Sequence, residues 1–365
     1  LADAHEAHHF YDPLTGTGFP GVRTEWLDAR RLSGAAVAVA PATAALDWLT
    51  AADNPLNVDG FWSQYEKAIA AATPGERSRH LAGALVAAGG LLHVLADLGS
   101  PTHVRGDVEA QFEQVGASAR DRGSRIERLA ALAWGRIGVP TATRVVTRAR
   151  LRDFFSMPSS AGSAGSDQVG LADWTARSFF TANTLPMDSD ITRTNVPPRL
   201  RRPAPELPTR LNLMAASNPD GATVETGAGV CLARYRVSHG TVQFSLDDAC
   251  LLEQAGALLP EVQAYSNGLL TFLFRGRLQV SVEAGGLNVR RAGALGAGSV
   301  VVFGEDARGV RTELSRTAVT SLGEQPVQIA LPALPARAVV MFRGVDAAGE
   351  SLIAVGTAAT TDRRR

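Results

Sequence analysis

The stretch LAGALVAAGGLLHVLADLGSPTHVRGD, from Leu81 to Asp107, decides the expected fold. Its first part, up to Leu92, is apolar on every side, which predicts a buried helix. His93 and Asp97 follow at a spacing of four residues, so both side chains leave the same helix face one turn apart. A buried aspartate is costly unless it is hydrogen-bonded, paired or bound to a metal ion. The stretch therefore predicts a buried helix that ends in a polar site.

The break after this helix is followed by a second pair of the same kind. Gly99-Ser100-Pro101 interrupts the helical pattern, and His103 with Asp107 repeats the four-residue spacing beyond it. A single His–Asp pair is explained by a hydrogen bond inside the core. Two pairs on either side of a proline break, in a chain with seven histidines, favour a metal site.

Outward from this stretch, the N-terminal part of the chain is rich in Ala and Leu at helical spacing. Gly89 and Gly90 cost roughly 1 kcal/mol each inside a helix, which indicates that another backbone packs closely there. We expect helices over residues 35–52, 58–72, 77–98, 124–137 and 171–181.

Residues 185–229 contain seven prolines and little periodicity, so a long irregular segment is expected there. Residues 230–246 alternate around Ser238-His239-Gly240, which predicts a hairpin. A helix in two pieces around Pro260 should follow and end near Phe274.

Beyond Gly276, six short strand-like runs separated by turns predict a β-sandwich. The expected fold is therefore mainly α. It consists of a multi-helix domain over residues 1–275, followed by a small all-β sandwich domain over residues 276–365.

Charge and composition exclude several classes of protein. The chain has 365 residues with 36 basic and 36 acidic side chains, so its formal net charge is zero. This balance argues against binding nucleic acid through a basic surface. Lys67 is the only lysine, and no phosphate-loop, dinucleotide or serine-elbow motif is present. No apolar run reaches the roughly 20 residues that span a bilayer.

Cys231 and Cys250 are the only cysteines. Either they pair with each other or they are two small core residues, and pairing is favoured if the protein is exported. The chain starts at Leu1 without methionine or a signal-like segment, so we expect a processed product.

The N-terminal histidines lead into a turn motif. His5, His8 and His9 are followed by Phe-Tyr-Asp12-Pro13. The aromatic and turn-forming residues indicate an ordered site rather than a flexible end.

Together these stretches resemble a known enzyme family. His93-xxx-Asp97-xxx-Pro101-x-His103 resembles the motif of zinc-dependent phospholipases C, a superfamily that also contains single-strand nucleases. His9-Phe-Tyr-Asp12-Pro13 resembles the His-Phe-aromatic-Asp-Pro turn of that family. Residues 170–180 and 260–270 resemble bacterial homologues, and the resemblance as a whole covers residues 5–275.

The resemblance implies a role for each matching residue. His93 and Asp97 would bind a central zinc ion, with Asp97 bridging to a neighbouring ion, and His103 would bind a second zinc ion. Glu127 matches the ligating carboxylate of the family. Asp12 matches the acidic residue that is the candidate base for the attacking water.

Some ligand positions of the family are filled differently. Gly123 stands where the family has a histidine four residues before the carboxylate, and no histidine lies between His9 and His80. Either His5, His8, Asp107 or Glu25 substitutes for the missing ligands, or the chain lacks a segment that supplies them, or the site has decayed. His9 is a further candidate ligand.

We therefore expect a metal-dependent hydrolase of the phospholipase C type, with roughly one to three zinc ions that activate water for attack on a phospholipid or another phosphodiester. The same fold would serve a nuclease or nucleotidase, which the neutral charge disfavours. The unmatched ligand positions instead fit a degenerate, non-catalytic binding or structural protein.

The expected partners follow from this interpretation. The sandwich would make peripheral contact with a membrane or a partner, and no specific nucleic-acid binding is expected. The resemblance implies a secreted or periplasmic bacterial protein.

Overall fold

The computed structural model describes residues 7–21, 41–111, 124–137, 144–158, 166–188, 216–217, 221–283 and 285–359. The chain divides into two compact units. The expected domain boundary between residues 275 and 276 stays a prediction. The first unit contains Leu1–Trp48, His93–Thr147 and Arg152–Gly268, and the second contains Leu49–Leu92, Arg148–Leu151 and Leu269–Arg365.

The expectation of a mainly α protein is wrong. Of the described residues, 39% are helical and 27% lie in strands of three antiparallel sheets, so the protein is mixed α/β with a β-rich C-terminal part. The described part of the helix expected over residues 35–52 is only α3 (Ala45–Trp48), preceded by a non-helical segment that contains Pro41. Proline lacks the N–H that a continuing helix needs.

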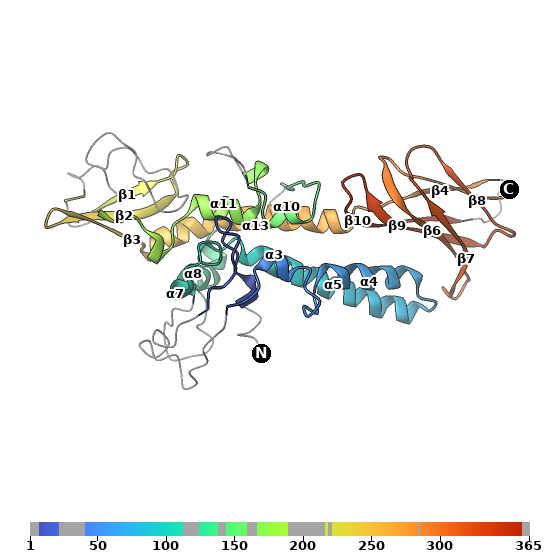
Figure 1. Cartoon of the computed structure of the whole chain (residues 1–365), viewed down its shortest axis with the longest axis horizontal. Helices are drawn as coiled ribbons and strands as arrows, with labels where there is room; N and C mark the ends of the chain where they lie inside the picture. The colour runs from blue at the N-terminus through green and yellow to red at the C-terminus, as the bar shows by residue number, and fades with distance from the viewer. Residues whose placement is uncertain are drawn as a thin grey trace, which may run out of the picture. The chain divides into compact units, whose positions relative to one another are not determined.

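Most of the helices that the structure describes in the first unit are short, whereas α13 (Asp248–Leu273) is long. α13 is continuous through Pro260, where a break was expected. α10 and α11 lie along it (Figure 1), and the Val146 N–H donates to the Ala264 carbonyl. The short elements are η1 (Ala7–His9), α3, α6 (Pro101–Val104), α7 (Val108–Gln111), α8 (Arg125–Leu132), α9 (Trp134–Ile137), α10 (Arg152–Phe155), η3 (Ser166–Gln168), α11 (Leu171–Ser178) and η4 (Ala182–Thr184).

The expected hairpin is present. β2 (Cys231–Ser238) and β3 (Thr241–Ser245) pair antiparallel, and β1 (Ala222–Glu225) adds a third strand beside β2. His239 and Gly240 both have positive φ, at 50° and 79°. Positive φ at both central residues is the conformation of a two-residue type I′ turn, which matches the twist of paired strands.

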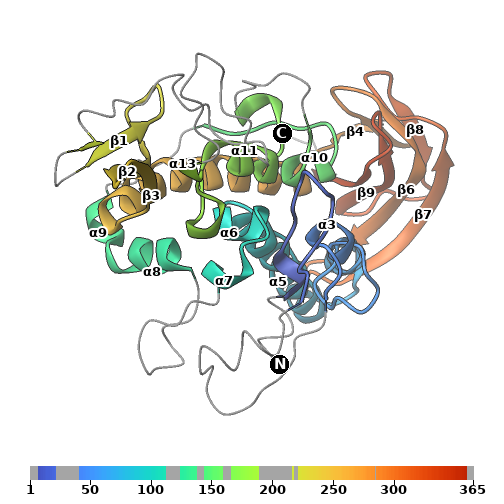
Figure 2. The ribbon, with the colours of Figure 1, turned by 60° about the vertical axis from the view of Figure 1, so that its left-hand side comes forward.

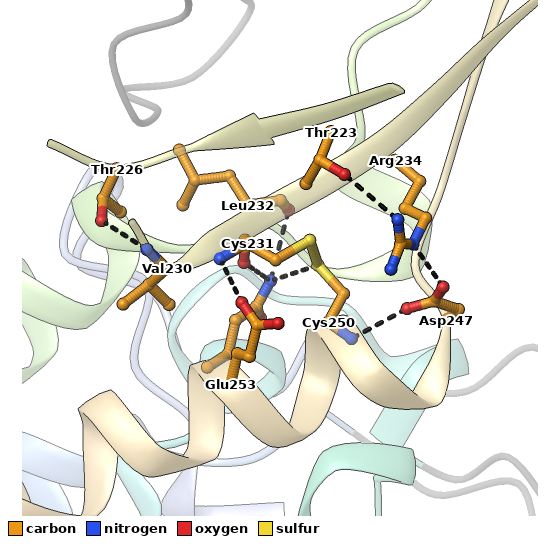
Figure 3. The surroundings of a disulfide bond; sticks show 10 residues. Thr223, Thr226, Val230, Cys231, Leu232, Arg234, Asp247, Cys250 and Glu253 are labelled. Carbon is orange, nitrogen blue, oxygen red and sulfur yellow. Dashed lines mark hydrogen bonds and ion pairs between the residues drawn. A yellow bond between two sulfur atoms is a disulfide. The ribbon is translucent and has the colours of Figure 1, made fainter. Parts of the chain in front are cut away.

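Cys231 and Cys250 form a disulfide that joins the start of β2 to the first turn of α13 (Figure 3). Both cysteines are buried. Beside them, the Glu253 carboxylate accepts a hydrogen bond of 3.0 Å from the Cys231 N–H, and the Gln254 amide donates to the Cys231 carbonyl. The question that the sequence left open is therefore answered in favour of pairing.

The second unit combines a helical hairpin with two sheets. α4 (Val58–Ala70) lies beside the N-terminal part of α5 (Pro74–Asp97) (Figures 1 and 2). The sheets have the orders β10-β9-β6-β7 and β4-β5-β8, and side chains from both form one core. β5 was not expected from the sequence. The strands are β4 (Gln279–Glu283), β5 (Gly286–Arg290), β6 (Leu295–Glu305), β7 (Arg311–Val319), β8 (Val327–Ala330), β9 (Arg337–Asp346) and β10 (Ser351–Ala359).

An ion cluster holds the helical hairpin of α4 and α5 against β7. The Glu305 carboxylate accepts a hydrogen bond of 2.8 Å from Arg311 and pairs with Arg77 and Arg337. The backbone N–H of Arg311 also donates to the Ala72 carbonyl, between α4 and α5. Residues that are far apart in the sequence are thus joined by an ion pair and by a backbone hydrogen bond.

α5 is less buried than its sequence suggests. Leu81, Leu85 and Val86 on α5 are exposed. The expectation of burial on every side was wrong for this face, because an apolar stretch does not reveal which of its faces is covered. Among the described residues, α5 alone is long and apolar enough to cross a membrane by length and composition, although no run of that length was expected. About a third of its most apolar window is buried, and the core helix of a soluble protein passes the same test.

Candidate metal centre

The N-terminal turn is fixed to two helices by its backbone. The Ala45 N–H at the start of α3 donates to the Phe10 carbonyl at 3.0 Å, and the Tyr11 N–H donates to the His103 carbonyl at 3.1 Å. The Phe10 ring packs against the His103 ring, with 4.6 Å between their centroids. These contacts place the preceding residue, His9, beside the last turn of α5.

His9, His93 and Asp97 form a compact group whose three ligand atoms all lie within 4.8 Å of one another. The Asp97 Oδ2 atom is 2.6 Å from His9 Nδ1 and 3.3 Å from His93 Nε2. His9 is buried, whereas the side chain of His93 is 64% exposed, so the group opens to solvent on one side. This group could hold a metal ion.

The electrostatic setting favours a charged Asp97. Burial alone would raise the pKa of Asp97. The hydrogen bond from His9 and the electrostatic interactions with His103, His9 and His93 outweigh that effect and hold the pKa below its ordinary value. The carboxylate is therefore ionised at neutral pH, as a metal ligand must be.

His103 and Glu127 form a second pair. His103 Nδ1 lies 3.6 Å from Glu127 Oε1, which is too long for a hydrogen bond. His103 is buried, and its Nδ1 atom has no hydrogen-bond partner among the described residues. Ligand atoms about 2.0–2.2 Å from a tetrahedral zinc ion are roughly 3.3–3.5 Å apart. The separations in the His93–Asp97 and His103–Glu127 pairs are therefore close to those of atoms that share one ion, whereas the 2.6 Å between His9 Nδ1 and Asp97 Oδ2 is a hydrogen-bond distance.

α8 presents Glu127 through a capping box. The Ser124 side chain accepts from the Glu127 N–H, and Glu127 Oε2 accepts from the Ser124 N–H. The same Oε2 atom accepts a hydrogen bond of 3.2 Å from the Gln111 amide. Oε1 is the oxygen that faces His103.

Two other predicted ligands, Asp107 and His8, have different partners. Asp107 caps α7 by accepting from the Ala110 N–H, and it accepts from both the backbone and the side-chain amide of Asn183. The His8 ring stacks on Trp48, with 3.9 Å between centroids. His5 is outside the described residues, as is Glu25. Ligand roles for these residues stay predictions.

Asp12 lies in the turn that follows His9. Its Oδ1 atom accepts a hydrogen bond of 3.0 Å from the Leu14 N–H, and its backbone pairs with Thr17. Asp12 also lines a cavity of about 120 Å³, whose other polar side chains are Arg105, Asp173 and Arg177. Arg105 holds one wall of the cavity, because its guanidinium donates to Thr184 on η4 and to the Ala176 carbonyl on α11.

The sequence did not reveal Thr102 and Gln111, which are hydrogen-bonded in a line to Glu127, or Arg105, which lines the cavity at Asp12. Arg105 and Thr102 lie close to His103 in the sequence, but neither forms a spaced pattern that indicates a site. Gln111 reaches Glu127 only through the fold. Comparison with protein-family models, with curated proteins and with solved structures finds no match to this chain.

Proposed function

We propose that the protein is a zinc-dependent phosphodiester hydrolase of the phospholipase C type. The observation that carries this proposal is the His9–His93–Asp97 group, which is open to solvent at His93. Within this group, His9 lies just before the turn that contains Asp12. Two imidazoles and one carboxylate are a donor set that catalytic zinc sites use. An open side is needed for water and substrate, because a catalytic metal keeps a position free of protein ligands.

Each residue has a role in this proposal. His9, His93 and Asp97 would hold the first ion, and His103 with Glu127 would hold a second. Bound zinc supplies Lewis acidity to the phosphodiester and to the attacking water. Asp12 would accept the proton of that water, since its carboxylate lies in the turn that follows His9 and lines a cavity.

Two further observations support an exported enzyme that acts on a small head group. A buried disulfide is typical of proteins that fold in oxidising compartments, which supports the proposed secreted or periplasmic location. The cavity beside Asp12 has room for a group of several atoms, and the net charge of zero disfavours a nucleic-acid substrate.

The test is metal content measured together with a substrate panel. Protein purified without a histidine tag or chelators should contain zinc and should release a phosphorylated head group from phosphatidylcholine vesicles. His93→Ala should lose zinc and lower the rate by about 100-fold or more. His80→Ala is the matched control on the same helix, because His80 bonds to Gln64 of α4 and its loss should leave both readings unchanged.

Other outcomes would identify the alternatives. Cleavage of single-stranded DNA without release from vesicles would favour the nuclease. Protein that contains no metal and cleaves neither substrate would contradict the proposal and favour a non-catalytic binding protein.

A further inference from the structure

Three side chains, Thr102, Gln111 and Glu127, form a line of hydrogen bonds. Thr102 Oγ1 donates to Gln111 Oε1 at 2.5 Å, and Gln111 Nε2 donates to Glu127 Oε2 at 3.2 Å. Ser100 Oγ lies 3.0 Å from Thr102 Oγ1. A threonine hydroxyl carries one hydrogen, which Gln111 receives, so Ser100 must be the donor to Thr102. All the donors in the line therefore point toward Glu127.

This direction fixes the Gln111 amide. Its oxygen accepts from Thr102, and its NH₂ group must then face the carboxylate of Glu127. A hydrogen bond from an amide to an ionised carboxylate is stronger than one between neutral groups. Because Thr102 and Gln111 are both buried, neither can exchange its partner for water without a cost.

This line of hydrogen bonds gives the two carboxylate oxygens of Glu127 different partners. Oε2 is held by Gln111 and by the Ser124 N–H. Oε1 is left facing His103 Nδ1, which has no hydrogen-bond partner among the described residues. We propose that Gln111, oriented by Thr102, is the positioning residue that aims Glu127 at an ion shared with His103. This inference rests on the proposed function, since it concerns the second ion of that site.

The expected effect is on affinity for the second ion. Partners that orient a metal ligand typically change metal affinity by about 10–100-fold when they are removed. Gln111→Met keeps the length of the side chain but removes the donor, so the second ion should bind about 10–100-fold more weakly. Gln111→Glu should weaken it further, because two carboxylates would then face each other. The ion at His93 should keep its affinity in both variants.

Thr102 supplies a test that separates positioning from folding. Thr102→Ser keeps the hydroxyl, so it should retain the wild-type affinity. Thr102→Val keeps the shape but loses the hydroxyl, so it should resemble Gln111→Met. Gln254→Met is the matched control. It removes another buried amide of the first unit, one that donates to the Cys231 and Leu232 carbonyls, and it should leave zinc binding unchanged.

The measurement is titration of stripped, full-length protein with Zn²⁺ in competition with a coloured chelator. Co²⁺ titration follows, because the visible spectrum of bound Co²⁺ reports the geometry of its ligands. The wild type should bind two ions, and the Gln111 and Thr102→Val variants should lose affinity and the cobalt spectrum for one of them only.

Four results would overturn the inference, and they differ in what they mean for the proposed function. Two ions bound by Gln111→Met with wild-type affinity would remove the positioning role and leave the function standing. Equal losses in Thr102→Ser and Thr102→Val would show that packing matters and the hydroxyl does not. A wild type that binds one ion, lost in His93→Ala, would deny the second position but keep the first. Protein that binds none would remove the proposed function as well.

Discussion

Asp173 shows how burial changes the chemistry of a single residue. Its side chain is 3% exposed at the start of α11, and it accepts a hydrogen bond of 2.8 Å from the Met157 N–H. Burial raises the pKa of Asp173, although hydrogen bonds from Ser156 and Met157 oppose the rise. The folded state thus binds the proton more tightly than the unfolded state. The contribution of Asp173 to the free energy of unfolding must therefore fall as pH rises from about 4, the ordinary pKa of aspartate, through the raised pKa.

Asp173→Asn imitates the protonated carboxyl and cannot ionise. Its destabilisation relative to the wild type should be largest near pH 4 and should shrink toward pH 7, as measured by urea unfolding at both values. Asp167→Asn, at an exposed site paired with Arg144, should not reproduce this trend. If the difference in free energy of unfolding between wild type and Asp173→Asn grew with pH, the pKa of Asp173 could not be raised by folding.

At the scale of elements, two glycines in long helices should respond oppositely to alanine. A side chain at Gly268 of α13 would collide with the Val146 carbonyl, whereas one at Gly89 of α5 would meet no atom within 4 Å in the part of the chain that the structure describes. Gly268→Ala should therefore lower the free energy of unfolding by about 1–3 kcal/mol. Gly89→Ala should raise it by about 0.5–1 kcal/mol, because alanine loses less backbone entropy in a helix. Urea unfolding of both variants checks this, and effects of the same sign would contradict the packing described.

At the scale of the whole molecule, Glu305 joins parts of the chain that are far apart in sequence. It is 9% exposed, and burial would raise its pKa, but Arg311, Arg337 and Arg77 hold the pKa below its ordinary value. The stability that it supplies is thus present above about pH 4.3 and is lost as pH falls through the lowered pKa. Glu305→Gln should lower the free energy of unfolding at pH 7 by about 2 kcal/mol.

Glu313 provides the comparison, because it pairs with Arg316 on the same sheet but is well exposed. Glu313→Gln should cost less than about 0.5 kcal/mol in the same urea experiment. Equal costs for the two substitutions would mean that the Glu305 cluster does not hold the hairpin to β7.

Local pattern explains which features could be predicted. Four-residue spacing was enough to put His93 and Asp97 on one helix face, and Ser238-His239-Gly240 was enough for the hairpin. Contacts between residues far apart in the sequence could not be predicted from local pattern. A close neighbour was expected at both Gly89 and Gly90, but only at Gly90 would a side chain collide with the described residues, where it would meet Leu56. The approach of His9 to Asp97 was implied only by a resemblance, and Gln111 was invisible because one glutamine among polar residues carries no pattern.

The uncovered apolar face of α5 has a consequence for how the protein behaves at the bench. Leu81, Leu85 and Val86 stay in water, and kosmotropic salts such as ammonium sulfate make exposed apolar surface more costly. Such a surface favours adsorption to a phenyl resin at high salt and elution as the salt is diluted. Replacing Leu85 and Val86 with glutamine would move elution to a higher sulfate concentration. Chromatographic retention thus becomes a simple gauge of how much of this helix the solvent reaches.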